Sequence, residues 1–221
     1  MPSLRWKLAQ WLQVHWWKRH LGNKRPPSKY LEAKEMQWNN FLQRLGIAPA
    51  PQELVLDAGC GPVGIFIALG KITRVDAVDP LLSKYEKALE HFQKERYPKV
   101  HFQAVELEHF LRQNGQPVSN RYDWIFCLNA LNRFDEMDKA LCTMSQALKP
   151  QGRLILSIDV HRFLLVKYLS KWLPWDLLTP QQADLQEYLK LAENCNLKRE
   201  KGFLNKKGIL FNYWVLVFTP A

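Results

Sequence analysis

A chain of 221 residues, 47% of them hydrophobic, is long enough for one well-filled core and too short for two ordinary domains. Its apolar stretches fall well below the ~20 residues that a membrane-spanning helix needs, and its basic N-terminus lacks the apolar core of a secretory signal. We therefore expect a cytoplasmic protein without a membrane span. Most of the excess behind the net charge of +10 lies before the first acidic residue, Glu32.

Residues 1–25 carry four tryptophans among basic side chains and predict a helix. At 3.6 residues per turn one side of this helix has an apolar stripe, and Trp6 and Trp17 point to the opposite side. The stripe consists of Leu4, Leu8, Trp11, Leu12 and Trp16. Two interpretations are open: the helix lies on an anionic membrane surface, or it packs on the domain by two faces.

A second helix is predicted at residues 28–45, ending before Gly46 and Pro49. The next stretch, residues 54–66, is the most informative. An apolar run ends in Asp57 and passes into Gly59, Gly61 and Gly64, the layout of a buried strand that feeds a tight turn and a helix. Glycine suits a turn in which the backbone bends sharply and lies close to a ligand.

A second short strand stops at Asp79, about 20 residues after Asp57, which is the spacing of a nucleoside-binding carboxylate. Asp79 can accept hydrogen bonds from both ribose hydroxyls. The alternative is a helix N-cap before Pro80, and one side chain can serve both roles.

Short apolar runs alternate with longer amphipathic stretches through the rest of the chain. Strands are predicted at 53–57, 73–78, 100–105, 122–129 and 152–159, and helices at 63–70, 81–96 and 135–148. A helix at 181–195 and strands at 197–204 and 209–218, joined through Asn205 to Gly208, complete the chain. This order predicts an α/β fold with a parallel sheet, helices on both faces, and ligands beyond the carboxyl ends of the strands.

The four cysteines, at 60, 127, 142 and 195, are far apart and form no Cys-x-x-Cys pair. Neither a metal site nor a disulfide framework is indicated. Cys60 and Cys127 are expected to be small core residues.

The motifs together resemble those of the class I S-adenosylmethionine-dependent methyltransferases. The matching segments are Leu-Asp-Ala-Gly-Cys-Gly-Pro at 56–62, Val-Asp-Pro at 78–80, the strand at 122–131 and Leu-Lys-Pro-Gln-Gly at 148–152. The resemblance covers residues 45–160 strongly and 179–219 loosely. It implies a Rossmann-like seven-stranded mixed sheet with an antiparallel final strand, S-adenosylmethionine as cofactor, and enzymatic methyl transfer. Residues 1–45 would then be a helical extension or lid on a cofactor-binding domain of residues 46–221.

Within that family the chain resembles a bacterial subgroup with poorly defined substrates, but has Asn132-Arg133 where the subgroup commonly has Asp-His. The resemblance implies cofactor contacts at the carboxyl ends of four strands. These residues are Asp57, Gly59 and Gly61 for the methionine end, Asp79 for the ribose, Glu106 and Leu107 for the adenine, and Asn129 beside the transferred methyl.

Methyl transfer from a sulfonium mainly requires an acceptor held in line with the methyl carbon, and a general base only where the acceptor must lose a proton. Location alone makes Asn129, Arg133, Asp159 and His161 weak catalytic candidates. Each has a structural alternative, such as a cap, a surface histidine or an ion pair.

The aromatic segment at 161–178 is expected to cover the acceptor site, which favours a small apolar, aromatic or lipid-like acceptor. A segment that only seals the edge of the domain is the alternative. Two other functions stay open: a nucleic-acid methyltransferase, suggested by the basic, aromatic N-terminus, and a non-catalytic binding protein on the same fold.

Overall fold

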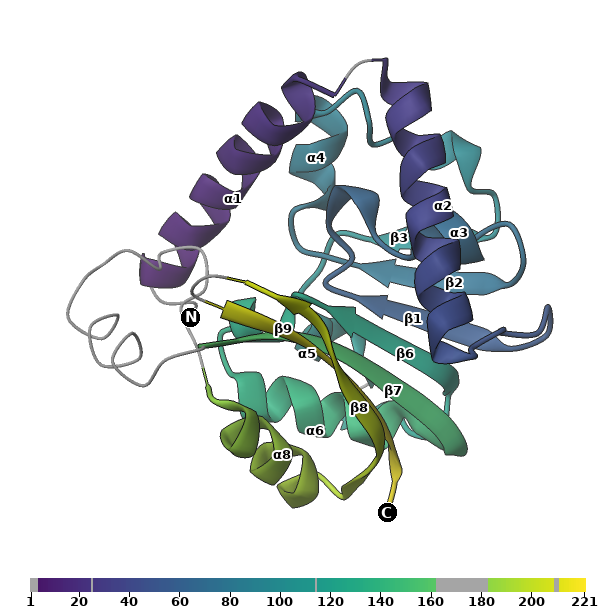
Figure 1. Ribbon diagram of the computed structural model, residues 1–221, viewed down its shortest axis with the longest axis vertical. Helices are drawn as coiled ribbons and strands as arrows, with labels where there is room; N and C mark the ends of the chain where they lie inside the picture. Colours follow the sequence, from purple (N-terminus) through teal and green to yellow (C-terminus); the bar gives the residue numbers. More distant parts are fainter. Residues whose placement is uncertain (1–3, 25, 114, 162–182, 209–210) are drawn as a thin grey trace.

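The computed structural model describes residues 4–24, 26–113, 115–161, 183–208 and 211–221 (Figure 1). Its main feature is a seven-stranded sheet in the order β3-β2-β1-β6-β7-β9-β8. The strands are β1 Leu54–Ala58, β2 Arg74–Val78, β3 Val100–Gln103, β6 Tyr122–Leu128, β7 Leu148–His161, β8 Leu197–Lys207 and β9 Phe211–Pro220. Strand β9 runs antiparallel to both of its neighbours, β7 and β8. The predicted mixed sheet with one antiparallel strand is confirmed.

Helices cover both faces of this sheet, and each face has its own apolar core. One face packs against α2 Pro27–Leu45, α3 Phe66–Leu69 and α4 Leu82–Ala88. The other packs against α5 Leu107–Phe110, α6 Met137–Ala147 and α8 Leu185–Asn194. Apart from Asp57, strand β1 is apolar because Val55 faces the first core while Leu56 and Ala58 face the second. A short β4–β5 pair, Arg112–Gln113 with Gln116–Pro117, lies apart from the main sheet.

Two predicted helices are much shorter in the structure. The helix predicted at 63–70 is a 3-10 turn, η1 Gly61–Val63, followed by α3, because Gly64 is extended and interrupts the helix. The helix predicted at 81–96 ends with α4, and a second 3-10 turn, η2 Lys94–Arg96, follows. Leu89 is extended there, and it and Phe92 are buried in the core, so burial overrides helical continuity.

The predicted loop of the closing hairpin is also wrong in its bounds. Strand β8 continues to Lys207, with Lys206 paired to Tyr213 of β9. Strand β7 extends further than predicted in both directions, from Leu148 to His161. These long strands support each other because β9 lies between β7 and β8 over most of its length.

The two predicted N-terminal helices are confirmed as α1 Leu4–Gly22 and α2. Figure 1 shows α1 on the side toward which β1 and β2 point, whereas α2 runs alongside α3. The face of α1 that contacts the domain carries Val14, Trp17 and the fully buried Leu21. Residues of the predicted apolar stripe face outward: Leu8 is 44%, Trp11 54% and Trp16 45% exposed.

A disulfide between Cys142 of α6 and Cys195, directly after α8, corrects the expectation that the cysteines form none. The pair is 53 residues apart in the chain, so no local spacing signals it. The fold brings the two together because α6 and α8 pack on the same face of the sheet, leaving their Cα atoms 4.6 Å apart. Cys60 and Cys127 are buried and free, as predicted.

No helix within the described ranges is long and apolar enough to cross a membrane.

Candidate functional site

The glycine turn after β1 has the tight geometry that its sequence predicts. Gly59 and Gly61 both have positive φ, +69° and +58°. The N–H groups of Gly59 and Cys60 donate to the carbonyl of Val78, at 2.8 and 3.2 Å, which ties the turn to the end of β2. A Cβ on Gly59 would lie 2.5 Å from the Cβ of Ala130, so both the backbone angle and the space require glycine there.

Asp57 supports this turn from inside the core. Its Oδ2 accepts a hydrogen bond from the N–H of Phe66 at 3.0 Å, at the start of α3. The side chain is 2% exposed, and burial raises its pKa to about 7. A Cβ on Gly64 would lie 2.4 Å from this carboxylate, which explains the third glycine of the motif. The geometry gives Asp57 a role in shaping the turn.

Asp79 joins the turn to the beginning of the next helix. Its Oδ2 accepts from the N–H of Gly61 at 3.1 Å and its Oδ1 from the N–H of Leu81 at 2.8 Å. The N-cap position of α4 is Leu81, so the N-cap alternative for Asp79 is wrong, although the carboxylate does bond to the backbone nearby. Burial raises the pKa of Asp79 to about 6, while the nearby charge of Arg133 opposes that rise.

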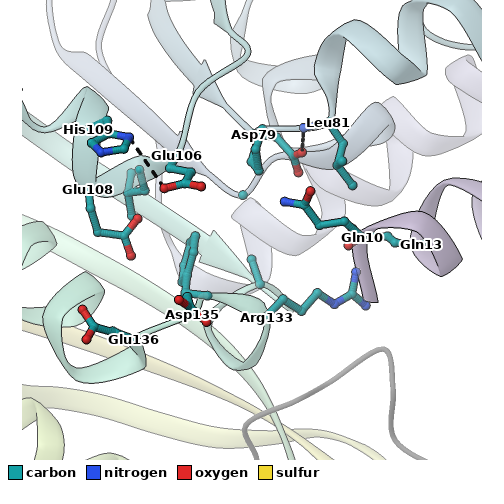
Figure 2. Close-up of a pocket in the computed structure, with 15 residues that line it drawn as sticks. Gln10, Gln13, Asp79, Leu81, Glu106, Glu108, His109, Arg133, Asp135 and Glu136 are labelled. Carbon is teal, nitrogen blue, oxygen red and sulfur yellow. Dashed lines mark hydrogen bonds and ion pairs between the residues drawn. The ribbon is translucent and has the colours of Figure 1, made fainter. Parts of the chain in front are cut away.

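A cavity of about 250 Å³ opens beside this carboxylate (Figure 2). Its lining comprises Gln10, Gln13, Gly59, Asp79, Pro80, Leu81, Glu106, Leu107, Glu108, His109, Ala130, Arg133, Phe134, Asp135 and Glu136. We call this the donor cavity, after the methyl donor that the sequence resemblance implies. The structure thus brings together Gly59, Asp79, Glu106, Leu107 and Arg133, which the sequence analysis selected from four separate segments.

The donor cavity is strongly acidic in a protein of net charge +10. Five of the lining residues are Asp or Glu, and Arg133 is the one permanent cation among the described residues that line it. On one side Glu106 precedes α5, where its carboxylate lies 3.6 Å from His109 Nδ1. Burial also raises the pKa of Glu108 on the same helix. Such a cavity attracts a cation and repels an anion.

Helix α1 closes the opposite side of the donor cavity, which no sequence motif indicated. Figure 2 shows Gln10 and Gln13 of α1 facing Glu106 and His109 across the cavity, and the Arg133 side chain extending toward α1. The Nε of Arg133 is buried without a hydrogen-bond partner in the described part of the chain. Trp17 of α1 lies 3.9 Å from the position of a Cβ on Gly61, so this helix also covers the glycine turn.

The remaining candidates lie elsewhere. Asn129, with φ +53°, accepts a 2.7 Å hydrogen bond from the hydroxyl of Ser157 and lines a second cavity, beside α2. Asp159 and His161 lie at the end of β7, paired with Tyr213 and Phe211 of β9, and Asp159 is not among the described residues that line the donor cavity. From residue 162 on, the predicted covering segment lies outside the described residues.

Comparison with known proteins identifies the family to which this chain belongs. Residues 50–205 match the family described as a methyltransferase domain. A ubiquinone biosynthesis O-methyltransferase of Rickettsia bellii is 25% identical over 183 residues, covering 73% of this chain and 68% of that protein. The solved structure of YcgJ from Bacillus subtilis has a TM-score of 0.62 at 15% identity, covering 81% of this chain and 96% of that one.

A second solved structure, geranyl diphosphate C-methyltransferase from Streptomyces coelicolor, has a TM-score of 0.63 at 14% identity, covering 84% of this chain and 79% of that one. At these identities the two structures show a shared fold. The family match, by contrast, spans well over half of the sequence and includes the glycine turn, Asp79 and Glu106. The chain therefore belongs to the class I S-adenosylmethionine-dependent methyltransferases.

Proposed function

We propose that this protein transfers the methyl group of S-adenosylmethionine, bound in the donor cavity, directly to a small apolar or aromatic acceptor. The observation that carries the proposal is the acidic donor cavity against a turn in which Gly59 leaves no room for a Cβ. At neutral pH the cofactor carries a sulfonium, an ammonium and a carboxylate, so its net charge is positive. A dinucleotide carries an anionic pyrophosphate, which five nearby carboxylates oppose.

The residues of the donor cavity fit the parts of this cofactor. Asp79 already bonds two backbone N–H groups, and its remaining lone pairs can accept from ribose hydroxyls. Glu106 and Leu107 follow β3 and offer an acceptor and an apolar wall for the adenine. Arg133 has an unused buried Nε–H and suits the carboxylate of the methionine end. Helix α1, with Gln10 and Gln13, closes the site, so within the helical extension of residues 1–45 we assign α1 the role of a lid.

The bound cofactor supplies an activated methyl group on a sulfonium. The chain's contribution is to orient the acceptor in line with that methyl carbon and to exclude water. We assign no general base here: Asp159 is not among the described residues that line the donor cavity, and the side-chain oxygen of Asn129 accepts a hydrogen bond from Ser157. An aromatic acceptor is supported by the printed name of the Rickettsia bellii relative, a ubiquinone biosynthesis O-methyltransferase.

Isothermal titration calorimetry with S-adenosylmethionine tests the donor cavity. We expect micromolar binding by the wild type and a loss of about tenfold or more for Asp79→Asn, because a charged hydrogen-bond acceptor is removed from a buried site. Glu193→Gln, which changes an exposed carboxylate of α8, serves as the matched control and should bind as the wild type does. No heat with the wild type, or tighter binding of NAD, would contradict the proposal.

Repeating the same titration at lower pH tests whether the negative charge of Asp79, and not only the shape of its side chain, contributes to cofactor affinity. With a pKa raised to about 6, Asp79 gains a proton as the pH falls from 8 to 5, and the cavity loses negative charge. Wild-type affinity should therefore fall over this range. Asp79→Asn has no carboxylate to protonate at this position and should show a flatter profile.

We also propose that the outward face of α1 rests on an anionic membrane surface. The exposed Leu8, Trp11 and Trp16 share the helix with Lys18 and Arg19, and α1 contains no acidic residue. Apolar side chains at the headgroup level and basic side chains near phosphates are the features of an interfacial helix. This contact would place a lipid-like acceptor near the lid.

A further inference from the structure

A second cavity, of about 490 Å³, lies between α2, the carboxyl end of β6, and residues of β7 and β8. We call it the α2 cavity. Its lining comprises Ala33, Lys34, Met36, Gln37, Trp38, Asn40, Phe41, Arg44, Leu128, Asn129, Ser157 and Asn205. Its volume lies within the range of small-molecule sites, and its lining mixes aromatic rings with amides and two cations.

The charge of the α2 cavity is opposite to that of the donor cavity. Lys34 and Arg44 line it, and no Asp or Glu is among the described residues that line it. Within the described ranges neither cation forms an ion pair. Burial lowers the pKa of Lys34, which means that its positive charge lacks compensation where it lies. An anion entering this cavity would supply that compensation.

Both cations are held in position while keeping free donors. Lys34 Nζ donates to Gln37 Oε1 at 3.0 Å and lies 4.9 Å from the ring centroid of Trp38. Arg44 Nη1 donates to Asn205 Oδ1 at 3.1 Å, and its guanidinium lies 5.8 Å from the ring centroid of Phe203. One of three lysine donors and one of five arginine donors are used in these bonds, so each group can still bind an anion.

The apolar wall of the α2 cavity is fixed to the cofactor-binding turn. Trp38 Nε1 donates to the carbonyl of Val63 at 3.1 Å, which anchors α2 to the turn that follows Gly61. Trp38 also packs edge-to-face with Phe41, their centroids 5.8 Å apart. This pair offers an aromatic surface for the body of a ligand.

Two consecutive residues at the end of β6 line one cavity each. Asn129 lines the α2 cavity, and its neighbour in the chain, Ala130, lines the donor cavity. A molecule in the α2 cavity would therefore lie beside the strand end that the sequence resemblance implies is next to the transferred methyl. The Asn129–Ser157 hydrogen bond lies at this boundary.

We propose that the α2 cavity binds the methyl acceptor and that the acceptor is an anion. A carboxylate or phosphate group would bind Lys34 and Arg44, and an apolar or aromatic body would pack against Trp38 and Phe41. The identification of this ligand as the methyl acceptor rests on the proposed function. Binding of an aromatic anion to the α2 cavity can be measured without the cofactor. The anion site narrows the acceptor class from apolar to amphiphilic and negatively charged.

Three probes of one shape test the proposal by calorimetry: 1-naphthoate, 1-naphthyl phosphate and the neutral 1-naphthalenemethanol. We expect both anions to bind about tenfold or more tightly than the neutral compound, and the tighter of the two to identify the anionic group. Lys34→Met and Arg44→Met remove the positive charge but retain an unbranched apolar side chain. Each should weaken anion binding by about tenfold. Lys84→Met, on the exposed side of α4, is the matched control and should bind as the wild type does.

Equal affinity for the neutral and anionic probes, or unchanged naphthoate binding by both Lys34→Met and Arg44→Met, would overturn the inference. Circular dichroism of each variant confirms that it is folded. Titration of S-adenosylmethionine into the same samples separates the two proposals. Naphthoate binding without cofactor binding would retain the anion site and remove the proposed function, and cofactor binding without naphthoate binding would do the reverse.

Discussion

Two glycines have nearly the same φ but different surroundings. Comparing them distinguishes the cost of the backbone conformation from the cost of filling space at the candidate site. Gly59, in the cofactor turn, has φ +69° and Gly46, at the end of α2, has φ +66°. A Cβ on Gly59 would meet the Cβ of Ala130 at 2.5 Å, whereas a Cβ on Gly46 would have no atom within 4 Å. Alanine would therefore pay the cost of a positive φ at both Gly46 and Gly59, but would clash with a neighbouring side chain only at Gly59.

We expect Gly46→Ala to lower the free energy of unfolding by about 1 kcal/mol, the usual cost of a left-handed alanine. Gly59→Ala should cost more, because Ala130 or the turn must shift, and should also abolish measurable S-adenosylmethionine binding. Urea unfolding and calorimetry on both variants check this. If both variants lose the same stability and keep the same affinity, the close fit at Gly59 is unimportant.

At this scale the sequence was informative wherever a motif carries its own geometry. Gly59, Asp79, Glu106 and Leu107 lie at the ends of recognisable strands, and the structure brings them to one cavity. Gln10 and Gln13 could not be found in this way, since they reach that cavity from a helix that lies well before β1 in the chain and has no motif.

Asn129 shows a different limit of prediction from sequence. Its position at the end of β6 was correctly predicted, but the direction of its side chain depends on a positive φ and on a hydrogen bond to Ser157, a residue 28 positions further along the chain. Neither feature has a sequence signal. The α2 cavity was for the same reason not anticipated, because its lining combines α2 with three separate strands or strand ends.

At the scale of elements, strand alternation predicted the sheet because buried parallel strands are apolar along their whole length. Helix lengths were less predictable. The apolar residues after Gly61 and after Leu82 continue to be buried where the backbone is no longer helical, so burial alone overestimated both helices. Tertiary contacts decide where such a segment leaves the helix.

The disulfide is an element-scale feature with a measurable consequence. It joins α6 to the segment after α8 and closes a loop of 53 residues, for which the chain-entropy estimate is about 4 kcal/mol as an upper value. We expect dithiothreitol to lower the urea midpoint of the wild type. A Cys142→Ala, Cys195→Ala double variant should have that lower midpoint with or without reductant.

Cys142 and Cys195 line a different cavity and are not among the described residues that line the donor cavity, so cofactor affinity should not change when the disulfide is reduced. A wild-type midpoint that does not respond to dithiothreitol would show that the pair contributes nothing to stability. Loss of cofactor binding with retained stability would instead indicate that the α6–α8 contact is coupled to the site.

At the scale of the whole molecule, charge is separated among three surfaces. Acidic residues gather at the donor cavity, two cations with no ion-pair partner in the described ranges line the α2 cavity, and Lys18 and Arg19 lie with exposed tryptophans on α1. Since α1 has one face over the donor cavity and the other outward, a surface bound by this helix would lie on the side of α1 opposite the donor cavity. A membrane-bound acceptor would then need to travel a short path into the protein.

This arrangement predicts binding to anionic vesicles that depends on both charge and aromatic side chains. Co-sedimentation with phosphatidylglycerol vesicles should exceed that with phosphatidylcholine vesicles and decrease with added salt. Lys18→Gln with Arg19→Gln should weaken it roughly 30-fold, at ~1 kcal/mol for each basic residue near the surface. Lys84→Gln with Lys87→Gln, an exposed pair on α4, is the matched control for net charge.

Trp11→Ser with Trp16→Ser should also weaken vesicle binding while leaving net charge unchanged, because these side chains are about half exposed on the outward face of α1. If the α4 pair reduces binding as much as the α1 pair, the attraction comes from net charge alone. If the charge variants lose affinity for RNA more than for vesicles, the outward face of α1 serves a nucleic acid, and a lipid-surface route to the acceptor site is excluded.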